Sequence, residues 1–284
     1  MLSSILSTGL AIGAIYALIA VTYNVMFSAS RVMSFTAGQV GMLGGVFGAW
    51  FILRLHLPIV AGFPLTLLAC AGIGVLTEIV AVRPVIAGLE KHLYVLSTLA
   101  LALMMQQFTA IEWSTEPQPF PRIFGGGFAL DEKFWLPLLA CAAVILGLEL
   151  LYRRTLVGRA FLAIAEDNYA ASALGLPVRD LRMASFALAG AIAGLAGFAG
   201  GQLLLASIAN GPMLNFYGFV PVALGGLGNN RGAIAGGLLL GLFQQAANFL
   251  VGGVLVSVAV FAAFIVVLMA APQGLFGAPP TRRV

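Results

Sequence analysis

The sequence predicts an all-α, polytopic membrane protein with about eight transmembrane helices, and two observations support this class. First, 61% of the 284 residues are hydrophobic and 8% are charged, with a mean hydropathy of +1.05. That is more apolar surface than a soluble core of this length can bury. Second, the apolar residues form long uninterrupted runs, such as 4–27 and 252–271, without the alternation of a membrane β-barrel. We therefore expect a single transmembrane domain over residues 1–284.

In chain order, the apolar runs predict helices near 4–27, 33–53, 57–80, 93–111, 134–152, 183–207, 232–250 and 252–271. The first run has no positive n-region, because Arg31 is the first basic residue, so it is expected to remain as a membrane helix. The segment 208–231 is rich in Gly and Pro and is too short for an ordinary span, which predicts a half-helix or re-entrant element. Cys70 and Cys141 lie inside apolar runs and indicate packing residues, with no disulfide or metal site.

The loops predict the orientation. The loop 153–182 contains five arginines, whereas the loop 112–133 contains four acidic residues against two basic ones. The positive-inside rule therefore places 153–182 in the cytoplasm and 112–133 in the periplasm, with the N-terminus outside. The C-terminal Thr-Arg-Arg-Val (281–284) also looks cytoplasmic, although eight spans would leave it outside unless the re-entrant segment supplies an odd crossing. The net charge of +4 belongs mainly to loops and tail and gives no indication of nucleic-acid binding.

Two distant segments are similar to each other. Residues 34–45 and 215–226 both contain a small polar residue, then Phe, then Leu-Gly-Gly eight residues after the Phe. Chance similarity in a Gly-rich chain is one interpretation. The other is a diverged internal repeat, which transport folds place around a central pathway.

The stretch 158–180 is unusually polar for this chain, since it contains Glu166 and Asp167 with several arginines in or beside it. A helix through 159–174 would carry one stripe at helical spacing, formed by Leu162, Ala165, Tyr169 and Ala173. Gly175 stands where helices commonly end in a left-handed residue, and a proline follows two residues later. We expect a surface helix of about four turns, with a solvated connecting loop as the alternative.

Four collinear motifs resemble the permease family of branched-chain amino acid ABC importers, the LivH/LivM permeases. The segment 163–176 (AIAEDNYAASALGL) resembles the ATPase-docking loop, and 77–85 (TEIVAVRPV) the Glu-x4-Arg-Pro segment of the family. The segment 224–241 (LGGLGNNRGAIAGGLLLG) is similar to its glycine-rich segment, and 272–277 (PQGLFG) to its C-terminal signature. The resemblance covers nearly the whole chain.

The resemblance implies a subunit of a larger assembly in the bacterial inner membrane. A homologous LivM-like permease would pair with the chain, two cytoplasmic LivG/LivF-like ATPases would bind below, and a periplasmic binding protein would deliver substrate. The sequence contains no G-x4-G-K-[ST] phosphate loop, so ATP would be bound by the partners, and no cofactor, metal or catalytic residue is expected in this chain. By analogy, the ATPase-coupling residues would be Arg159, Leu162, Glu166, Asp167, Tyr169 and Gly175. Among them, Leu162 and Tyr169 would pack against the permease itself.

The candidate translocation pathway lies in the two similar segments, where broken helices would expose backbone groups to a cavity. Its residues are Ser34, Phe35, Gly38, Gln39, Asn215 and Phe216. Relatives usually read Asn-Phe-Ala-x-Gly where this chain has residues 34–38, Ser-Phe-Thr-Ala-Gly. Branched-chain amino acids are the first expectation for the substrate. Other amino acids, urea and short amides, or small carboxylates are alternatives.

A different functional class is a stand-alone secondary carrier or channel, which the possible repeat would fit. Within the spans the acidic residues are Glu78 and Glu149, both near the cytoplasmic ends. This distribution argues against a proton-coupled carrier, which would normally need a charged group near the midplane. An enzyme is not expected, because no cluster of nucleophile, base and orienting group is visible.

Overall fold

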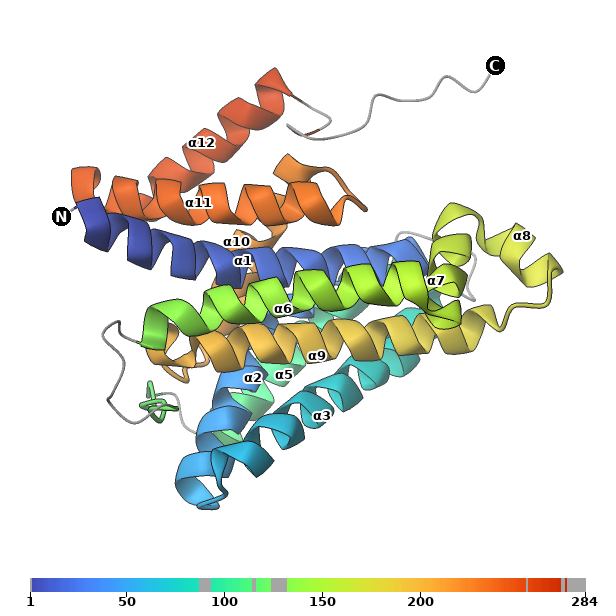
Figure 1. The fold of residues 1–284 in the computed structure, drawn as a ribbon, viewed down its shortest axis with the longest axis horizontal. Coiled ribbons are helices and arrows are strands. Elements are labelled where there is room, and N and C mark those ends of the chain that lie inside the picture. Colours follow the sequence, from blue (N-terminus) through green and yellow to red (C-terminus); the bar gives the residue numbers. More distant parts are fainter. Residues whose placement is uncertain are drawn as a thin grey trace.

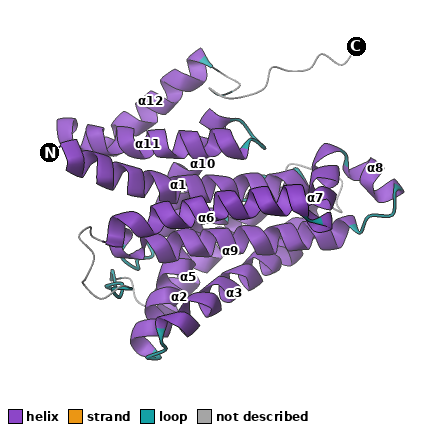
Figure 2. Ribbon diagram, viewed as in Figure 1, coloured by secondary structure: helices purple, strands orange, loops and turns teal. Residues whose placement is uncertain are grey.

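A computed structural model describes residues 2–86, 93–113, 116–123, 132–253, 255–271 and 274, and helices dominate it (Figures 1 and 2). The helices in chain order are α1 (Leu2–Ser30), α2 (Ala37–Ala49), α3 (Ile59–Thr77), α4 (Arg83–Ile86), α5 (Leu93–Trp113), α6 (Glu132–Arg154), α7 (Leu156–Glu166), α8 (Asn168–Ala173), α9 (Val178–Leu204), α10 (Asn210–Gly225), α11 (Asn230–Val251) and α12 (Val256–Ala270). Two π-helical turns, η1 (Trp50–Arg54) and η2 (Glu78–Val82), extend α2 and α3.

In the described ranges, six helices are long and apolar enough to cross a membrane: α1, α3 with its extension, α5, α6, α9 and α11. The other two predicted spans, 33–53 and 252–271, form shorter α-helices of 13 and 15 residues, α2 and α12. The all-helical class is confirmed, but the count of eight full-length spans is not. Together with the apolar outer surface, the six helices indicate a multi-pass membrane protein.

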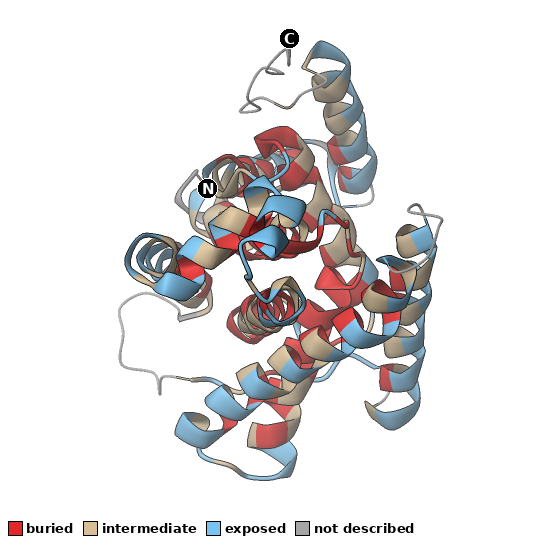
Figure 3. Cartoon of the chain, turned by 90° about the vertical axis from the view of Figure 1, so that its right-hand side faces the viewer, coloured by how far each residue is buried: buried red, intermediate tan, exposed pale blue. Residues whose placement is uncertain are grey.

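α1 and α9 form the centre of the molecule, and the other helices surround them (Figures 1 and 3). About two thirds of the apolar window of each is buried (67%), against 22% for α3, α5 and α6. The outer helices present large apolar side chains to the surroundings, among them Leu68, Leu103, Phe108 and Met269. Such a surface is stable in lipid, where no hydrophobic penalty applies to exposed Leu, Met or Phe.

Small residues allow α9 to touch its neighbours backbone to backbone. A Cβ added to Gly197 would lie 1.7 Å from the carbonyl oxygen of Gly41 on α2, and one added to Gly190 would lie 2.3 Å from that of Cys70 on α3. Glycines on α9 therefore permit close approach of the helix backbones. On the other side of α1, Gly13 and Gly237 make a similar close contact between α1 and the antiparallel α11.

The segment predicted as a half-helix contains the short helix α10. Its 16 residues span about 24 Å at 1.5 Å per residue, less than the ~30 Å of a hydrocarbon core. α10 follows an antiparallel bridge between Ala206 and Gln118 and ends beside the loop whose Gly228 N–H donates to Asn24 Oδ1 of α1 (3.0 Å). It therefore runs from the side of the molecule where α9 ends back toward the side where α1 ends.

The end of α12 likewise lies on the side of the molecule where α7 lies. Gly274, with φ of +84°, packs against the last turn of α10, because a Cβ there would lie 2.7 Å from the carbonyl oxygen of Ala223. The remaining residues of the C-terminal signature, and the basic tail at 281–284, lie outside the described residues.

Candidate functional site

The polar stretch after α6 folds as two helices, so the expectation of one continuous helix over 159–174 is wrong. α7 begins after Thr155, whose Oγ1 accepts the N–H of Gly158 (2.9 Å). It ends at Asp167, which has extended backbone angles (φ −150°, ψ 109°). Asp167 Oδ1 accepts the N–H groups of Tyr169 (2.8 Å) and Ala170 (3.1 Å) and so starts α8. Asp is a strong N-cap residue, which explains why the helix breaks here.

The break changes which side chains face the molecule. Phe161, Ile164 and Ala171 are buried and pack with Leu181 at the start of α9. Leu162 and Tyr169 are instead exposed, at 47% and 86%. The expectation that Tyr169 packs against the permease itself is therefore wrong, because a stripe drawn through an unbroken helix loses its register at Asp167. Leu162, which precedes the break, faces a cavity beside α1.

The outer face of α7 and α8 is both apolar and charged, and we call it the loop face. Leu174 is 83% exposed, and Arg159, Glu166 and Asp167 are exposed as well. The loop face thus comprises Arg159, Glu166, Asp167, Tyr169 and Leu174. It projects from one end of the bundle (Figure 1). Large exposed apolar groups rimmed by charge are typical of a protein-binding surface.

α8 ends in a glycine-dependent turn. Gly175 has φ of +82°, its N–H donates to the carbonyl of Ser172 (3.0 Å), and the N–H of Leu176 donates to that of Ala171 (3.1 Å). These two bonds form the Schellman arrangement, in which a left-handed residue satisfies the last carbonyl groups of a helix. The left-handed residue expected at Gly175 is confirmed.

The loop is firmly attached to the bundle. A Cβ on Gly158 would lie 1.9 Å from the carbonyl oxygen of Leu151, so the start of α7 packs directly on the end of α6. The guanidinium of Arg31, just after α1, donates to the carbonyl of Ala165 in the last turn of α7. A cation at a helix C-terminus is favoured by the helix dipole.

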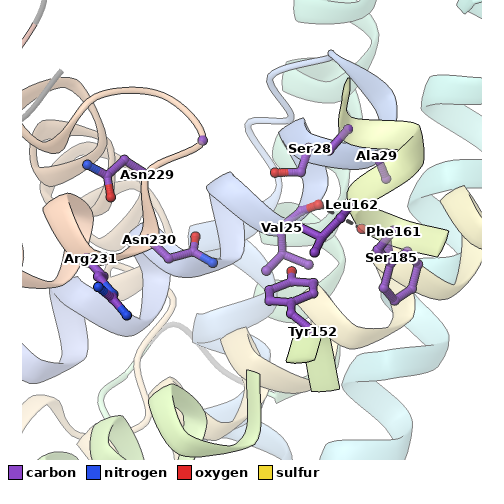
Figure 4. Close-up of a pocket in the computed structure, with 12 residues that line it drawn as sticks. Val25, Ser28, Ala29, Tyr152, Phe161, Leu162, Ser185, Asn229, Asn230 and Arg231 are labelled. Carbon is purple, nitrogen blue, oxygen red and sulfur yellow. Dashed lines mark hydrogen bonds between the residues drawn. The ribbon is translucent and has the colours of Figure 1, made fainter. Parts of the chain in front are cut away.

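A cavity of about 290 Å³ lies between the loop and the bundle. Figure 4 shows Asn229, Asn230 and Arg231 on one side of it, and Ser28 and Leu162 on the other. The wall therefore combines α1, α7 and the turn between α10 and α11. A movement of α7 would change the shape of this cavity.

The six candidate pathway residues meet only in part. Asn215 of α10 accepts the N–H of Gly38 in the first turn of α2 (2.7 Å), and the hydroxyl of Tyr23 donates to the same Oδ1 (3.0 Å). Gln39 is 2% exposed and packs on Gly211. A Cβ added to Gly211 would lie 1.9 Å from Oε1 of Gln39. Gly38, Gln39 and Asn215 thus lie together at a junction of α1, α2 and α10.

The other three lie around this junction. Ser34 and Thr36 are buried, and their hydroxyl oxygens are 2.8 Å apart. The Phe35 ring lies 6.2 Å from that of Phe219, whereas Phe216 lies against Phe261 of α12 (5.9 Å). The two similar segments are therefore neighbours, but Phe216 points away from the others.

The junction is polar and enclosed. Within the described residues, Gln39 Oε1 is buried without a hydrogen-bond partner. A buried polar atom of this kind normally requires a partner, so the junction has spare hydrogen-bonding capacity. Tyr23 was not predicted for this site, and no pattern in the sequence could have indicated it, since its partner is 192 residues away.

The chain is similar over almost its whole length to known permeases. It is 28% identical to the high-affinity branched-chain amino acid transport system permease protein LivH of Escherichia coli K12, covering 97% of this chain and 96% of that protein. It is 27% identical to BraD of Pseudomonas aeruginosa PAO1, a permease of the same description, over 98% and 97%. LivM of E. coli K12 is 29% identical over 54% of this chain and 36% of its own length. No solved structure matches the chain.

Residues 5–271 match the family described as the branched-chain amino acid transport system, permease component. This range includes both π-helical turns, the α2–α10 junction and the entire α7–α8 loop. The match therefore covers the features that the structure places together. The chain belongs to this permease family.

Proposed function

We propose that the chain is the permease subunit of an ABC importer for branched-chain amino acids and forms half of the translocation pathway. Membership of the permease family over residues 5–271 carries this proposal. The chain itself would not hydrolyse ATP, because its sequence lacks the G-x4-G-K-[ST] phosphate loop. Separate ATPase subunits would supply the energy.

The loop face would bind an ATPase. Tyr169 and Leu174 are large apolar side chains on α8 and its end that are 86% and 83% exposed, and they can enter an apolar groove. Aromatic anchors of this kind contribute most of the energy of many interfaces. Arg159, Glu166 and Asp167 would make polar contacts around them. The rigid attachment of α7 to α6 supports transmission of ATPase closure to the bundle as a rigid-body movement.

The partners follow from the same assignment. A LivM-like permease would complete the pathway, two LivG/LivF-like ATPases would bind at the loop faces, and a periplasmic binding protein would deliver the substrate. Similarity to both LivH and LivM supports pairing of related permeases. The assembly would be located in the bacterial inner membrane, with the loop face in the cytoplasm.

The α2–α10 junction would lie beside the pathway. Gln39 and Asn215 offer amide groups, and Phe35 offers apolar surface, to a substrate with both polar and apolar parts. Residues 34–38 depart from the usual family pattern, so urea, short amides and small carboxylates are competing substrates. The ligand that co-purifies with the binding protein distinguishes them.

Reconstitution in liposomes tests the function. We expect ATP-dependent uptake of labelled leucine only when the permease pair, both ATPases and the binding protein are present. Uptake driven by a gradient with this chain alone would contradict the proposal and favour a secondary carrier or channel.

Surface variants test the loop face. Tyr169→Ala combined with Leu174→Ala should release the ATPases from the purified complex and abolish uptake. Leu68→Ala is the matched control, because Leu68 is 69% exposed but lies in α3, within a span. Equal ATPase retention in the two proteins would contradict the role of the loop face.

A further inference from the structure

A buried carboxylate joins two helices close to the α7–α8 loop. The side chain of Glu78 is fully buried (0% exposed) in the π-helical turn η2. Its Oε2 lies 2.6 Å from Arg83 Nη2, and its Oε1 accepts from Arg182 Nε of α9 (2.9 Å). Arg182 is itself only 13% exposed. Glu78 and Arg182 are 104 residues apart in the chain.

The two ion pairs of Glu78 do more than neutralise its charge within η2. A carboxylate buried near the end of a helix needs a cation, and Arg83 alone would supply one. The second guanidinium comes from a different helix and presents both Nε and Nη2 to one carboxylate oxygen, each at 2.9 Å. Such contacts are strong and fix the relative position of the groups they join.

Arg182 directly follows Leu181, the residue of α9 that packs against the α7–α8 loop. The preceding residue, Leu181, is buried among Phe161, Ile164 and Ala171 of α7 and α8. The first turn of α9 is therefore in contact with the loop through Leu181 and with η2 through Arg182. A displacement of the loop that moves this turn must move Glu78 or break its ion pair.

The π-helical turn extends the connection to α5. The carbonyl of Ala81, within η2, accepts the hydroxyl of Ser97 of α5 (2.8 Å). π-helical turns occur frequently at functional sites. Farther along the helices, α3 and α9 touch through Gly74 and Gly190, without side chains between their backbones.

We propose that Glu78 is a positioning residue that links the first turn of α9 to η2, so that movement of the α7–α8 loop displaces α3 and α5 together with α9. This inference rests on the proposed function, because it assigns a route for the force that the ATPases would supply. It adds a residue that touches neither the ATPase surface nor the α2–α10 junction. The coupling between ATP hydrolysis and transport should depend on it.

The test compares Glu78→Gln with Glu149→Gln in the complete reconstituted complex. Glu149 is the matched control, because it is paired with Arg153 (2.9 Å) but is 42% exposed at the end of α6. For Glu78→Gln we expect normal assembly and basal ATP hydrolysis, with uptake per ATP reduced about tenfold, within the usual range of coupling between sites. Arg182→Gln should do the same, and the double variant should be no worse than either single one.

The outcomes separate a positioning role from a structural one. A structural role would lower the amount of assembled complex, the hydrolysis and the uptake in proportion, and an unchanged ratio of uptake to ATP would overturn the inference. If Glu78→Gln does not assemble, Arg182→Lys and Ser97→Ala provide milder changes along the same route. Normal ratios in both of these variants would also overturn it.

The wild-type complex shows whether the proposed function has failed or only the proposed role of Glu78. If it shows no ATP-dependent uptake, the proposed function fails and this inference fails with it. If it couples normally and Glu78→Gln retains the wild-type ratio, only the inference fails.

Discussion

Asn215 links two distant helices through a single side-chain oxygen. It accepts the N–H of Gly38, at 2.7 Å, and the hydroxyl of Tyr23, at 3.0 Å. The N–H groups in the first turn of a helix have no partner within that helix. Asn215 of α10 therefore caps α2, and its amide oxygen connects α1, α2 and α10.

Asn215→Ala should destabilise the protein. The substitution leaves the N–H of Gly38 without a partner in a buried position, at an expected cost of about 1–3 kcal/mol. The measurement is the thermal unfolding midpoint of the detergent-purified protein. Asn248→Ala, at an exposed position on α11, should unfold as the wild type does. Identical midpoints for the two variants would show that the cap does not matter.

At the scale of elements, two types of glycine act differently. Gly197 is needed because α2 approaches within the space of a Cβ, whereas Gly175 has open space around it but a left-handed backbone. The first is a packing requirement and the second a conformational one. Each predicts a different failure when the glycine is replaced.

Gly175→Val should reduce transport while membrane insertion remains normal. The left-handed conformation costs a residue with a Cβ roughly 1–2 kcal/mol, and a β-branched residue is the least suited to it. The end of α8 should loosen, which would weaken ATPase retention and uptake. Gly175→Asn is the control, because Asn tolerates this conformation. Normal uptake and ATPase co-purification in the Val variant would count against the assigned role of the loop.

Gly197→Ala should impair folding, whereas Gly147→Ala should not. A Cβ at position 197 would lie 1.7 Å from the carbonyl oxygen of Gly41, but one at position 147 of α6 meets nothing within 4 Å. Overpacking of this kind typically costs about 1–3 kcal/mol, and more where backbone cannot move. Size-exclusion chromatography and unfolding midpoints measure the difference. Similar profiles for both proteins would contradict the α2–α9 contact.

At the scale of the whole molecule, α9 runs between two opposite ends of the bundle. Its 27 residues extend over about 40 Å. The α7–α8 loop precedes it, and Ala206, just after it, pairs with Gln118 in the connection between α5 and α6. The proposed orientation places the loop in the cytoplasm and Gln118 outside.

Cysteine labelling tests this orientation. In a background with Cys70→Ala and Cys141→Ala, an impermeant maleimide should label Gln118→Cys in spheroplasts and Tyr169→Cys in inverted vesicles. Both native positions are exposed in this chain, so in membranes from cells that lack the ATPase subunits, access should depend on the side alone. Labelling of both variants from one side would refute the orientation.

Several features could be predicted from local sequence alone. The six long helices correspond to apolar runs, the short α10 to the Gly- and Pro-rich segment, and the left-handed turn at Gly175 to a glycine followed by Pro177. Each depends on a pattern of neighbouring residues. The four family motifs could also be identified, because each is a pattern of neighbouring residues. The break at Asp167 was missed, because the helical period was continued through a residue that also starts helices well.

The sequence by itself thus determined that this chain is a helical membrane protein of a particular permease family, since hydropathy and motifs are local properties. Only the tertiary structure decided which sides of α7 and α8 are exposed, that Asn215 caps α2, and that Glu78 binds Arg182. These contacts join residues as far as 177 positions apart. They depend on how whole helices pack against one another, and the spacing of residues along one helix does not specify its neighbour.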